Sequence, residues 1–152
     1  MQDTVMKSIV NGVYILTVQQ QGRVNGATVA WVTQVSHDPL LIMVSLAGVR
    51  FSHDMVKQSG YFGLSVLSQD QVALARDFGF KTGRDTNKFE GVGYSASDQG
   101  LPILDDACAY IECRLVSTFP AGDHTLLVGE VVEARTLKDD ARPLVFRKED
   151  YF

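Results

Sequence analysis

Short strand-forming runs separated by turn residues occupy most of this chain and constrain its fold more than any other feature. The first, from Val13 to Val18, is rich in β-branched and aromatic residues, and Gln19 to Gly22 after it is a predicted turn. A longer run from Gly26 to Ser36 is broken by His37-Asp38-Pro39. Leu40 to Leu46 is almost entirely apolar, which is typical of a strand covered on both faces. The first third of the chain therefore predicts three strands.

Two helical patterns interrupt the strands. Ser52 can cap a short helix that ends near Gly60, since Ser is a preferred residue before the first helical turn. The run Ser68-Gln69-Asp70-Gln71 has the S-x-x-Q spacing of a capping box, which predicts a helix to about Phe78. Between these helices, Tyr61 to Leu67 is predicted to be another strand.

The second half of the chain returns to strands. Residues 107–119 and 124–135 are predicted to be two long strands, with Pro120-Ala121-Gly122-Asp123 as the hairpin between them. Leu144 to Phe146 is a short closing strand. Several strands with two short helices, and no strand–helix alternation, predict a mainly β (α+β) chain built on an antiparallel barrel. The length of 152 residues and the lack of a linker or repeat predict one domain, residues 1–152.

Composition and charge argue against several classes of partner. The net charge is −4, so a basic footprint for nucleic acid is missing. No apolar run approaches the roughly 18 residues that a membrane span needs. The first residues lack the basic start and apolar stretch of a signal peptide. We therefore expect no nucleic acid, no membrane and a cytoplasmic location.

The two cysteines are not arranged as a disulfide or a metal site. Cys108 and Cys113 are five residues apart in one predicted strand, so their side chains point to opposite faces. A single C-x4-C pair does not make a zinc site. We expect buried free thiols, in a reducing compartment.

Several common catalytic motifs are missing from the sequence. The histidines at 37, 53 and 124 do not have the H-E-x-x-H spacing, and the chain contains no G-x-S-x-G nucleophile elbow. It contains neither a G-x-x-x-x-G-K-[ST] phosphate loop nor a G-x-G-x-x-G dinucleotide fingerprint. A nicotinamide cofactor, if the protein uses one, binds without a Rossmann motif.

Three groups of residues are candidates for ligand binding. On the run 26–36, Thr28, Gln34 and Ser36 form a polar face that can bond a heterocycle or phosphate; the alternative is a solvent-facing strand. Arg50 and Ser52 flank the start of a predicted helix, where free N–H groups and a cation suit a phosphate monoester; the alternative is an ordinary capped helix.

The third group lies in and after the long loop 79–93. This loop holds four glycines and the cations Lys81, Arg84 and Lys88, and loops of this length are often functional; the alternative is a solvated charged loop. His124, at the end of the predicted hairpin, can donate to a ligand at the barrel mouth, or it is a plain turn residue.

An ordered set of short motifs resembles the flavin-reductase-like family, whose fold is a split β-barrel that binds FMN. The set covers the chain from Gly12 to Phe152. It comprises Gly12-Val13-Tyr14-Ile15-Leu16-Thr17, Gly26-Ala27-Thr28 through Val35-Ser36 with Asp38-Pro39, Phe62 to Leu67 with Gln71, Tyr110-Ile111-Glu112-Cys113, Gly122-Asp123-His124, Val128-Gly129-Glu130-Val131 and Pro143-Leu144-Val145-Phe146. Within the family, Gln34 and the run 78–85 resemble the flavin domains found with rubredoxin modules in anaerobes.

This resemblance implies a split antiparallel barrel with Greek-key character, a homodimer and a flavin lying on the strand from Thr28 to Ser36. It implies phosphate contacts from Arg50, Ser52 and the loop carrying Lys81, and places His124 as the catalytic residue where the nicotinamide meets the flavin. The chain departs from the family pattern at Ala30, where Ser or Asn is usual, and at Gln34, where Ser is usual. The implied cofactor-binding residues are Thr28, Val29, Ala30, Trp31, Thr33, Gln34, Val35, Ser36, Ser45, Arg50, Phe51, Ser52, Phe80, Lys81 and Arg84.

The function that this resemblance implies is hydride transfer from NADH or NADPH to FMN, with electrons passed to a free flavin, a metal chelate or a partner redox protein. The isoalloxazine does this chemistry, so the lack of acid–base motifs is consistent with it. One alternative is a flavin-carrying electron-transfer protein without its own nicotinamide site. Another is a barrel without flavin that acts as an interaction module.

Replacing Arg50 tests the phosphate assignment. We expect Arg50→Ala to weaken FMN binding by about 1 to 3 kcal/mol, because a charge-assisted hydrogen bond to the phosphate is lost. Titration of the flavin-free protein with FMN measures this change. Unchanged affinity would remove Arg50 from the site.

Overall fold

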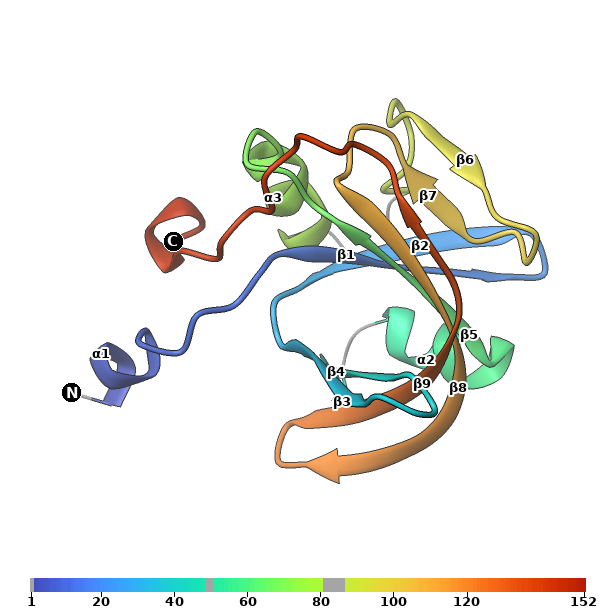
Figure 1. Cartoon of the computed structure of the whole chain (residues 1–152), viewed down its shortest axis with the longest axis horizontal. Coiled ribbons are helices and arrows are strands. Elements are labelled where there is room, and N and C mark those ends of the chain that lie inside the picture. The colour runs from blue at the N-terminus through green and yellow to red at the C-terminus, as the bar shows by residue number, and fades with distance from the viewer. Residues whose placement is uncertain (1, 49–50, 81–86) are drawn as a thin grey trace.

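One antiparallel sheet of seven strands curls into the barrel that dominates the computed structural model (Figure 1). The structure describes residues 2–48, 51–80 and 87–152. The strands lie in the order β2-β1-β5-β8-β9-β4-β3. Their bounds are β1 (Tyr14–Gln20), β2 (Arg23–Val29), β3 (Val32–Ser36), β4 (Leu41–Ala47), β5 (Tyr61–Val66), β8 (Ala109–Ala121) and β9 (His124–Thr136). The predicted split antiparallel barrel is confirmed.

The predicted long strand 26–36 is wrong as a single strand, because the chain breaks it at Ala30 and Trp31. The residues before the break form β2 and pair with β1, whereas those after it form β3 and pair with β4. β2 and β3 are the two edges of the seven-stranded sheet, so this break is the place where the barrel is split. Ala27 and Val29 of β2 are buried, whereas β3 is largely exposed.

The inside of the barrel is filled by the first of two apolar clusters. Alternate residues of β1, Leu16 and Val18, point into it together with Phe62 and Leu64 of β5. Helix α2 (Phe51–Ser59) adds Met55 and Val56, both buried, to the same cluster. The predicted role of Ser52 as a cap is wrong, because the helix already includes Phe51 and Ser52 is its second residue. Its side chain is buried instead.

The second cluster lies on the other face of β1. Ile15 of β1 packs there with Ala75 and Phe78 of α3 (Val72–Phe80). A small second sheet, β6 (Tyr94–Ala96) paired with β7 (Pro102–Leu104), adds Leu104 to this cluster. The sequence patterns missed these two short strands, and the helix extends two residues beyond the predicted end at Phe78.

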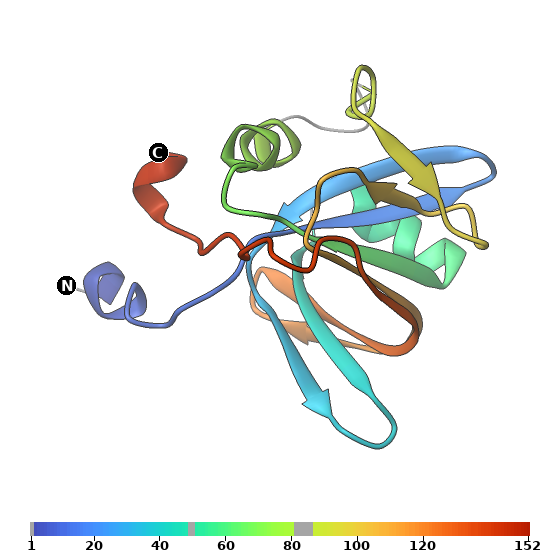
Figure 2. The same ribbon diagram turned by 45° about the horizontal axis from the view of Figure 1, so that its top comes forward.

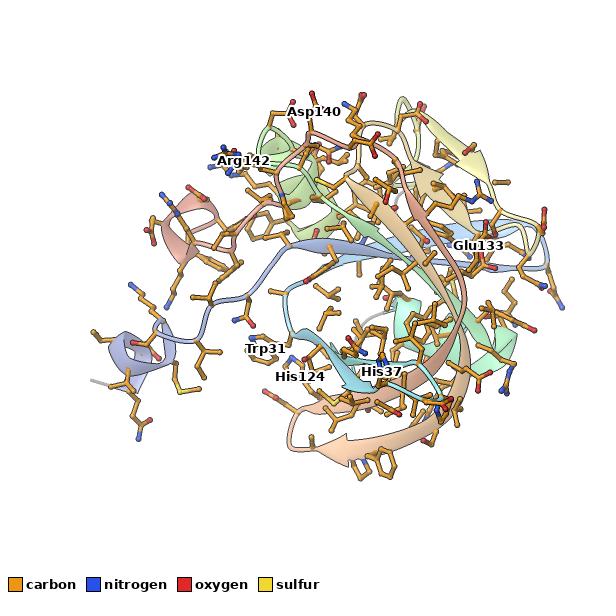
Figure 3. The ribbon with its side chains drawn as sticks, in the orientation of Figure 1. Trp31, His37, His124, Glu133, Asp140 and Arg142 are labelled. Atoms are coloured by element: carbon orange, nitrogen blue, oxygen red, sulfur yellow. The ribbon has the colours of Figure 1, made fainter. Side chains whose placement is uncertain are left out.

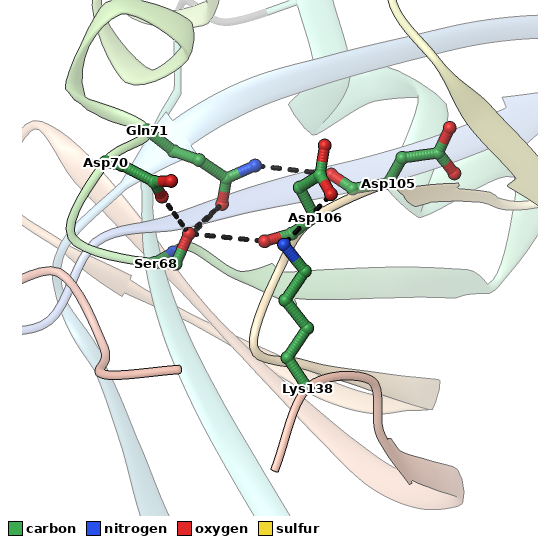
Figure 4. A network of polar contacts seen from close by, with 6 residues as sticks. All are labelled: Ser68, Asp70, Gln71, Asp105, Asp106 and Lys138. Carbon is green, nitrogen blue, oxygen red and sulfur yellow. Dashed lines mark hydrogen bonds and ion pairs between the residues drawn. The ribbon is translucent and has the colours of Figure 1, made fainter. Parts of the chain in front are cut away.

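A polar network holds the start of α3 (Figure 4). The Ser68 backbone N–H donates to Gln71 Oε1 at 2.9 Å, which is the side-chain half of the predicted capping box. The Ser68 hydroxyl donates to Asp70 Oδ1 at 2.6 Å, and regular helix begins only at Val72. Lys138 Nζ lies 2.9 Å from Asp106 Oδ1. This ion pair connects the segment after β9 to Asp106, whose carbonyl accepts a hydrogen bond from the Ser68 hydroxyl.

The β8–β9 hairpin is confirmed, with a shorter turn than predicted. Ala121 pairs with His124, so only Gly122 and Asp123 form the turn. The predicted closing strand 144–146 is wrong: the chain there makes isolated bridges, Gly12 with Val145 and Ser68 with Pro143. Cys108 and Cys113 are both free and buried, as expected.

The two outermost segments lie on the same side of the barrel, away from the sheet (Figure 2). They are α1 (Gln2–Met6) and the short helix η1 (Lys148–Asp150). Within residues 2–48, 51–80 and 87–152, no helix is long and apolar enough to cross a bilayer.

Close packing between β5 and β9 gives a stability prediction. A Cβ at Gly129 would lie 2.6 Å from Cys113 Cβ and 2.8 Å from the Phe62 ring. We expect Gly129→Ala to lower the free energy of unfolding by about 1 to 3 kcal/mol, because neither neighbour can move without disturbing the interior. Urea denaturation measures the change. Gly48→Ala is the control, since a Cβ there meets nothing within 4 Å; equal effects of the two variants would contradict this packing.

Candidate active site

The break between β2 and β3 opens into a cavity of about 360 Å³, which we call the inner cavity. Its volume lies in the range of small-molecule sites. Seven of the predicted site residues line it: Thr28, Val29, Ala30, Trp31, Ser45, Phe80 and His124. The sheet brings them together because the start of β9 pairs with the end of β4, Ala47 with His124 and Ser45 with Leu126.

Small residues leave room in the inner cavity. Ala30, Ala47, Ala75 and Gly79 all line it. Helix α3 is held against β2 there, because the Thr28 hydroxyl donates to the Ala75 carbonyl at 2.5 Å. The short side chains leave space that a flat ring can occupy.

Aromatic side chains also line the inner cavity. Phe146 and Tyr151 from the last residues of the chain stack with ring centroids 5.2 Å apart and 7° between their planes. Phe80 of α3 meets Phe152 edge to face at 5.9 Å. The Arg76 Nε–H donates to the Asp150 carbonyl and fastens this segment to α3. Burial raises the pKa of the Tyr151 hydroxyl.

His124 sits at the mouth of the inner cavity beside Trp31 (Figure 3). Their ring centroids are 4.8 Å apart, with 41° between the planes. His124 Nδ1 lies 2.7 Å from Asp123 Oδ1, and this hydrogen bond holds the pKa of the Asp123 carboxyl below its usual value. When Nδ1 carries the proton for Asp123, Nε2 is the nitrogen left for another partner.

Four predicted cofactor-binding residues lie away from the inner cavity. Thr33, Gln34, Val35 and Ser36 are on β3, which is largely exposed at the sheet edge. The Gln34 side-chain amide donates to the Ser36 carbonyl at 3.2 Å. The break at Ala30 and Trp31 separates this strand from the residues that do line the cavity.

The predicted phosphate-binding residues are only partly described. Arg50, Lys81 and Arg84 lie outside the described residues, and of Phe51 only the backbone position, at the start of α2, is described. Ser52 is 1% exposed, and its hydroxyl has no hydrogen-bond partner among the described residues. A buried polar group without a partner is unusual and marks a place where a ligand can supply one.

Sequence reasoning missed the residues that join the inner cavity from far along the chain. Ala75 and Gly79 come from α3, and Phe146, Tyr151 and Phe152 come from a segment with no regular pattern. Only the aromatic content of residues 146–152 could have signalled them. Lys88, considered as a loop cation, is buried instead, and its ammonium donates to the carbonyls of Gly26 at 2.8 Å and Phe78 at 3.0 Å.

Comparison with known proteins identifies the architecture. Residues 6–152 match the flavin reductase like domain family. A ferric-chelate reductase (NAD(P)H) from Archaeoglobus fulgidus is 38% identical over 130 residues, 84% of this chain and 77% of that protein. A high molecular weight rubredoxin from Moorella thermoacetica is 35% identical over 139 residues, 90% of this chain; the chain spans 61% of that relative's length. The expected likeness to rubredoxin-associated flavin domains is thus confirmed.

Solved structures agree with this match. The FMN-binding protein from Thermus thermophilus, crystallised with 1-cyclohex-2-enone, superposes with a TM-score of 0.84 at 27% identity. The aligned region covers 93% of this chain and 84% of that one.

The contact between Trp31 and His124 can be tested by fluorescence, because Trp31 is the single tryptophan of the sequence. We expect His124→Ala to change the emission intensity of the flavin-free protein, because the indole of Trp31 loses the ring that lies 4.8 Å from it. His37→Ala is the control, because His37 is exposed and no contact of its ring with Trp31 is seen among the described residues. Equal spectra of the parent and His124→Ala would contradict the contact.

Proposed function

We propose that this chain, which belongs to the flavin reductase like domain family, binds FMN in the inner cavity and reduces flavin with NADH or NADPH. The observation that carries the proposal is the gathering of seven predicted cofactor-binding and catalytic residues around that cavity. The proposal treats residues 1–152 as one flavin-binding domain.

The residues present fit a flavin. Its ring is flat and aromatic with a polar edge, and the lining of the inner cavity combines small residues, aromatic residues and the hydroxyls of Thr28 and Ser45. We assign the ring to this cavity. The unpartnered Ser52 hydroxyl, at the first turn of α2, is assigned to the phosphate together with Arg50 and Lys81.

Bound FMN supplies the hydride chemistry, and this chain's residues position the reactants. Trp31 and His124 lie side by side in the lining of the inner cavity, and the Trp31 side chain is largely exposed, so we place the approaching nicotinamide beside this pair. Asp123 holds the His124 ring by Nδ1, and Nε2 is then available to a polar group of the incoming nicotinamide. His124 is thus proposed as the catalytic residue through contact with the donor.

We further propose that the protein works as a homodimer in the cytoplasm and passes electrons to a small molecule or a partner redox protein. Large exposed apolar side chains on the β8–β9 hairpin, Val116, Phe119 and Val132, support a contact with a second copy. The two buried free thiols are consistent with a reducing compartment.

Stopped-flow mixing with NADH or NADPH tests the proposed activity. We expect the FMN-loaded protein to lose its visible flavin absorbance rapidly under anaerobic conditions. A yellow protein that neither nucleotide bleaches would instead be a flavin-carrying electron-transfer protein. A protein that does not bind added FMN would contradict both and support an interaction module.

Filling the inner cavity tests where the ring binds. A Cβ at Gly79 would lie 3.6 Å from the Thr28 side chain, an ordinary contact, so Gly79→Ala should bind FMN normally. Gly79→Leu should weaken FMN binding by about tenfold or more, because its longer side chain occupies the space of the ring; tenfold is about 1.4 kcal/mol. Fluorescence titration with FMN measures both. Equal affinity of the Leu and Ala variants would place the ring elsewhere.

A further inference from the structure

A second and larger cavity, of about 660 Å³, lies between α1 and the segment that carries η1. We call it the outer cavity. Trp31 and Phe146 line both cavities, so one ligand can extend from the inner into the outer cavity along these two rings. Figures 1 and 2 show α1 and η1 lying on the same side of the barrel, apart from the sheet.

The chemistry of the outer cavity combines apolar contacts with positive charge. Met6 and Ile9 join the two shared aromatic rings as apolar walls. Its lining contains more cationic than anionic side chains: the cations are Lys7, Arg147 and Lys148, and the anions are Asp3 and Glu149.

Two of these cations have no partner. Lys148 Nζ lies 3.9 Å from Asp3 Oδ2 and is paired. Among the described residues, the Lys7 ammonium and the Arg147 guanidinium have neither an ion-pair nor a hydrogen-bond partner. A cavity with aromatic walls and two unpaired cations suits an anionic ligand that also carries a flat ring.

We infer that the outer cavity binds the adenosine diphosphate half of the nicotinamide donor. The inference rests on the proposed function, which puts the nicotinamide at the mouth of the inner cavity beside Trp31. A dinucleotide joins its two ring systems through a pyrophosphate, so the second half must lie close by. Across Trp31 the outer cavity offers apolar surface for the adenine and cations for the pyrophosphate.

The apolar walls alone would also suit a second copy of this chain. The unpaired cations favour the nucleotide, because an apolar partner surface would bury Lys7 and Arg147 without compensation. The nucleotide supplies the matching negative charge itself.

Titration with ADP tests this inference without requiring turnover. ADP is added to the FMN-saturated protein in a calorimeter, at low and at high salt. We expect binding that weakens with ionic strength, and that weakens about tenfold in the double variant Lys7→Gln, Arg147→Gln, since two charge-assisted contacts are lost. In steady-state assays the same variant should raise the KM for NADH much more than it lowers kcat. Arg142→Gln is the control, because Arg142 is exposed and lines neither cavity; it should bind ADP normally.

The outcomes separate this inference from the proposed function. A protein that binds FMN and oxidises NADH, but binds no ADP and keeps its KM in the double variant, overturns the inference and leaves the function intact. Loss of dimer in the double variant, with no ADP binding in the parent, assigns the outer cavity to a second copy and also overturns it. Failure to bind FMN at all contradicts the proposed function instead.

Discussion

The rest of the structure depends on the break at Ala30 and Trp31, where the chain passes from one edge strand of the sheet to the other. β2 pairs with β1, and β3 pairs with β4. These two edge strands follow each other in the chain but are not paired with each other, so the barrel is open between them. The Ser45 N–H donates to the Trp31 carbonyl at 2.9 Å and holds the break against β4. With the backbone fixed there, the Trp31 side chain is left 54% exposed between two cavities.

A second constraint keeps the inner cavity open on its other side. The buried Lys88 ammonium joins the Gly26 carbonyl of β2 to the Phe78 carbonyl near the end of α3. A cation at the carboxyl end of a helix is favourable because the last carbonyls have no partners within the helix. Together with the Thr28–Ala75 hydrogen bond, this contact sets Gly79 and Phe80 at the cavity wall. Hydrogen bonds to backbone carbonyls, one of them from the Thr28 hydroxyl and two from a buried ammonium, therefore position the part of α3 that lines the inner cavity.

The sequence patterns predicted the strands that have strong local signals. The runs at Tyr61 and at residues 107–135, and the helix after Ser68, appear within a few residues of their predicted bounds. The break at Ala30 has no such signal, because Ala and Trp are both compatible with a strand. The strand is interrupted there only because the residues before the break pair with β1 and those after it pair with β4. For the same reason the alternation of side chains predicts one polar face for Thr28, Gln34 and Ser36, which the break at Ala30 and Trp31 separates. Phe146 and Tyr151 reach the site through long-range packing, which local patterns do not contain.

The flavin ring is proposed to lie in the inner cavity, between α3 and the pair Trp31 and His124. A crystal structure of the protein grown with FMN tests this placement. We expect electron density for the ring against Ala30, Gly79 and Trp31, with the phosphate directed to the first turn of α2 near Ser52. Density for the ring at any other surface, with the inner cavity filled by side chains or water, would show that the ring binds elsewhere.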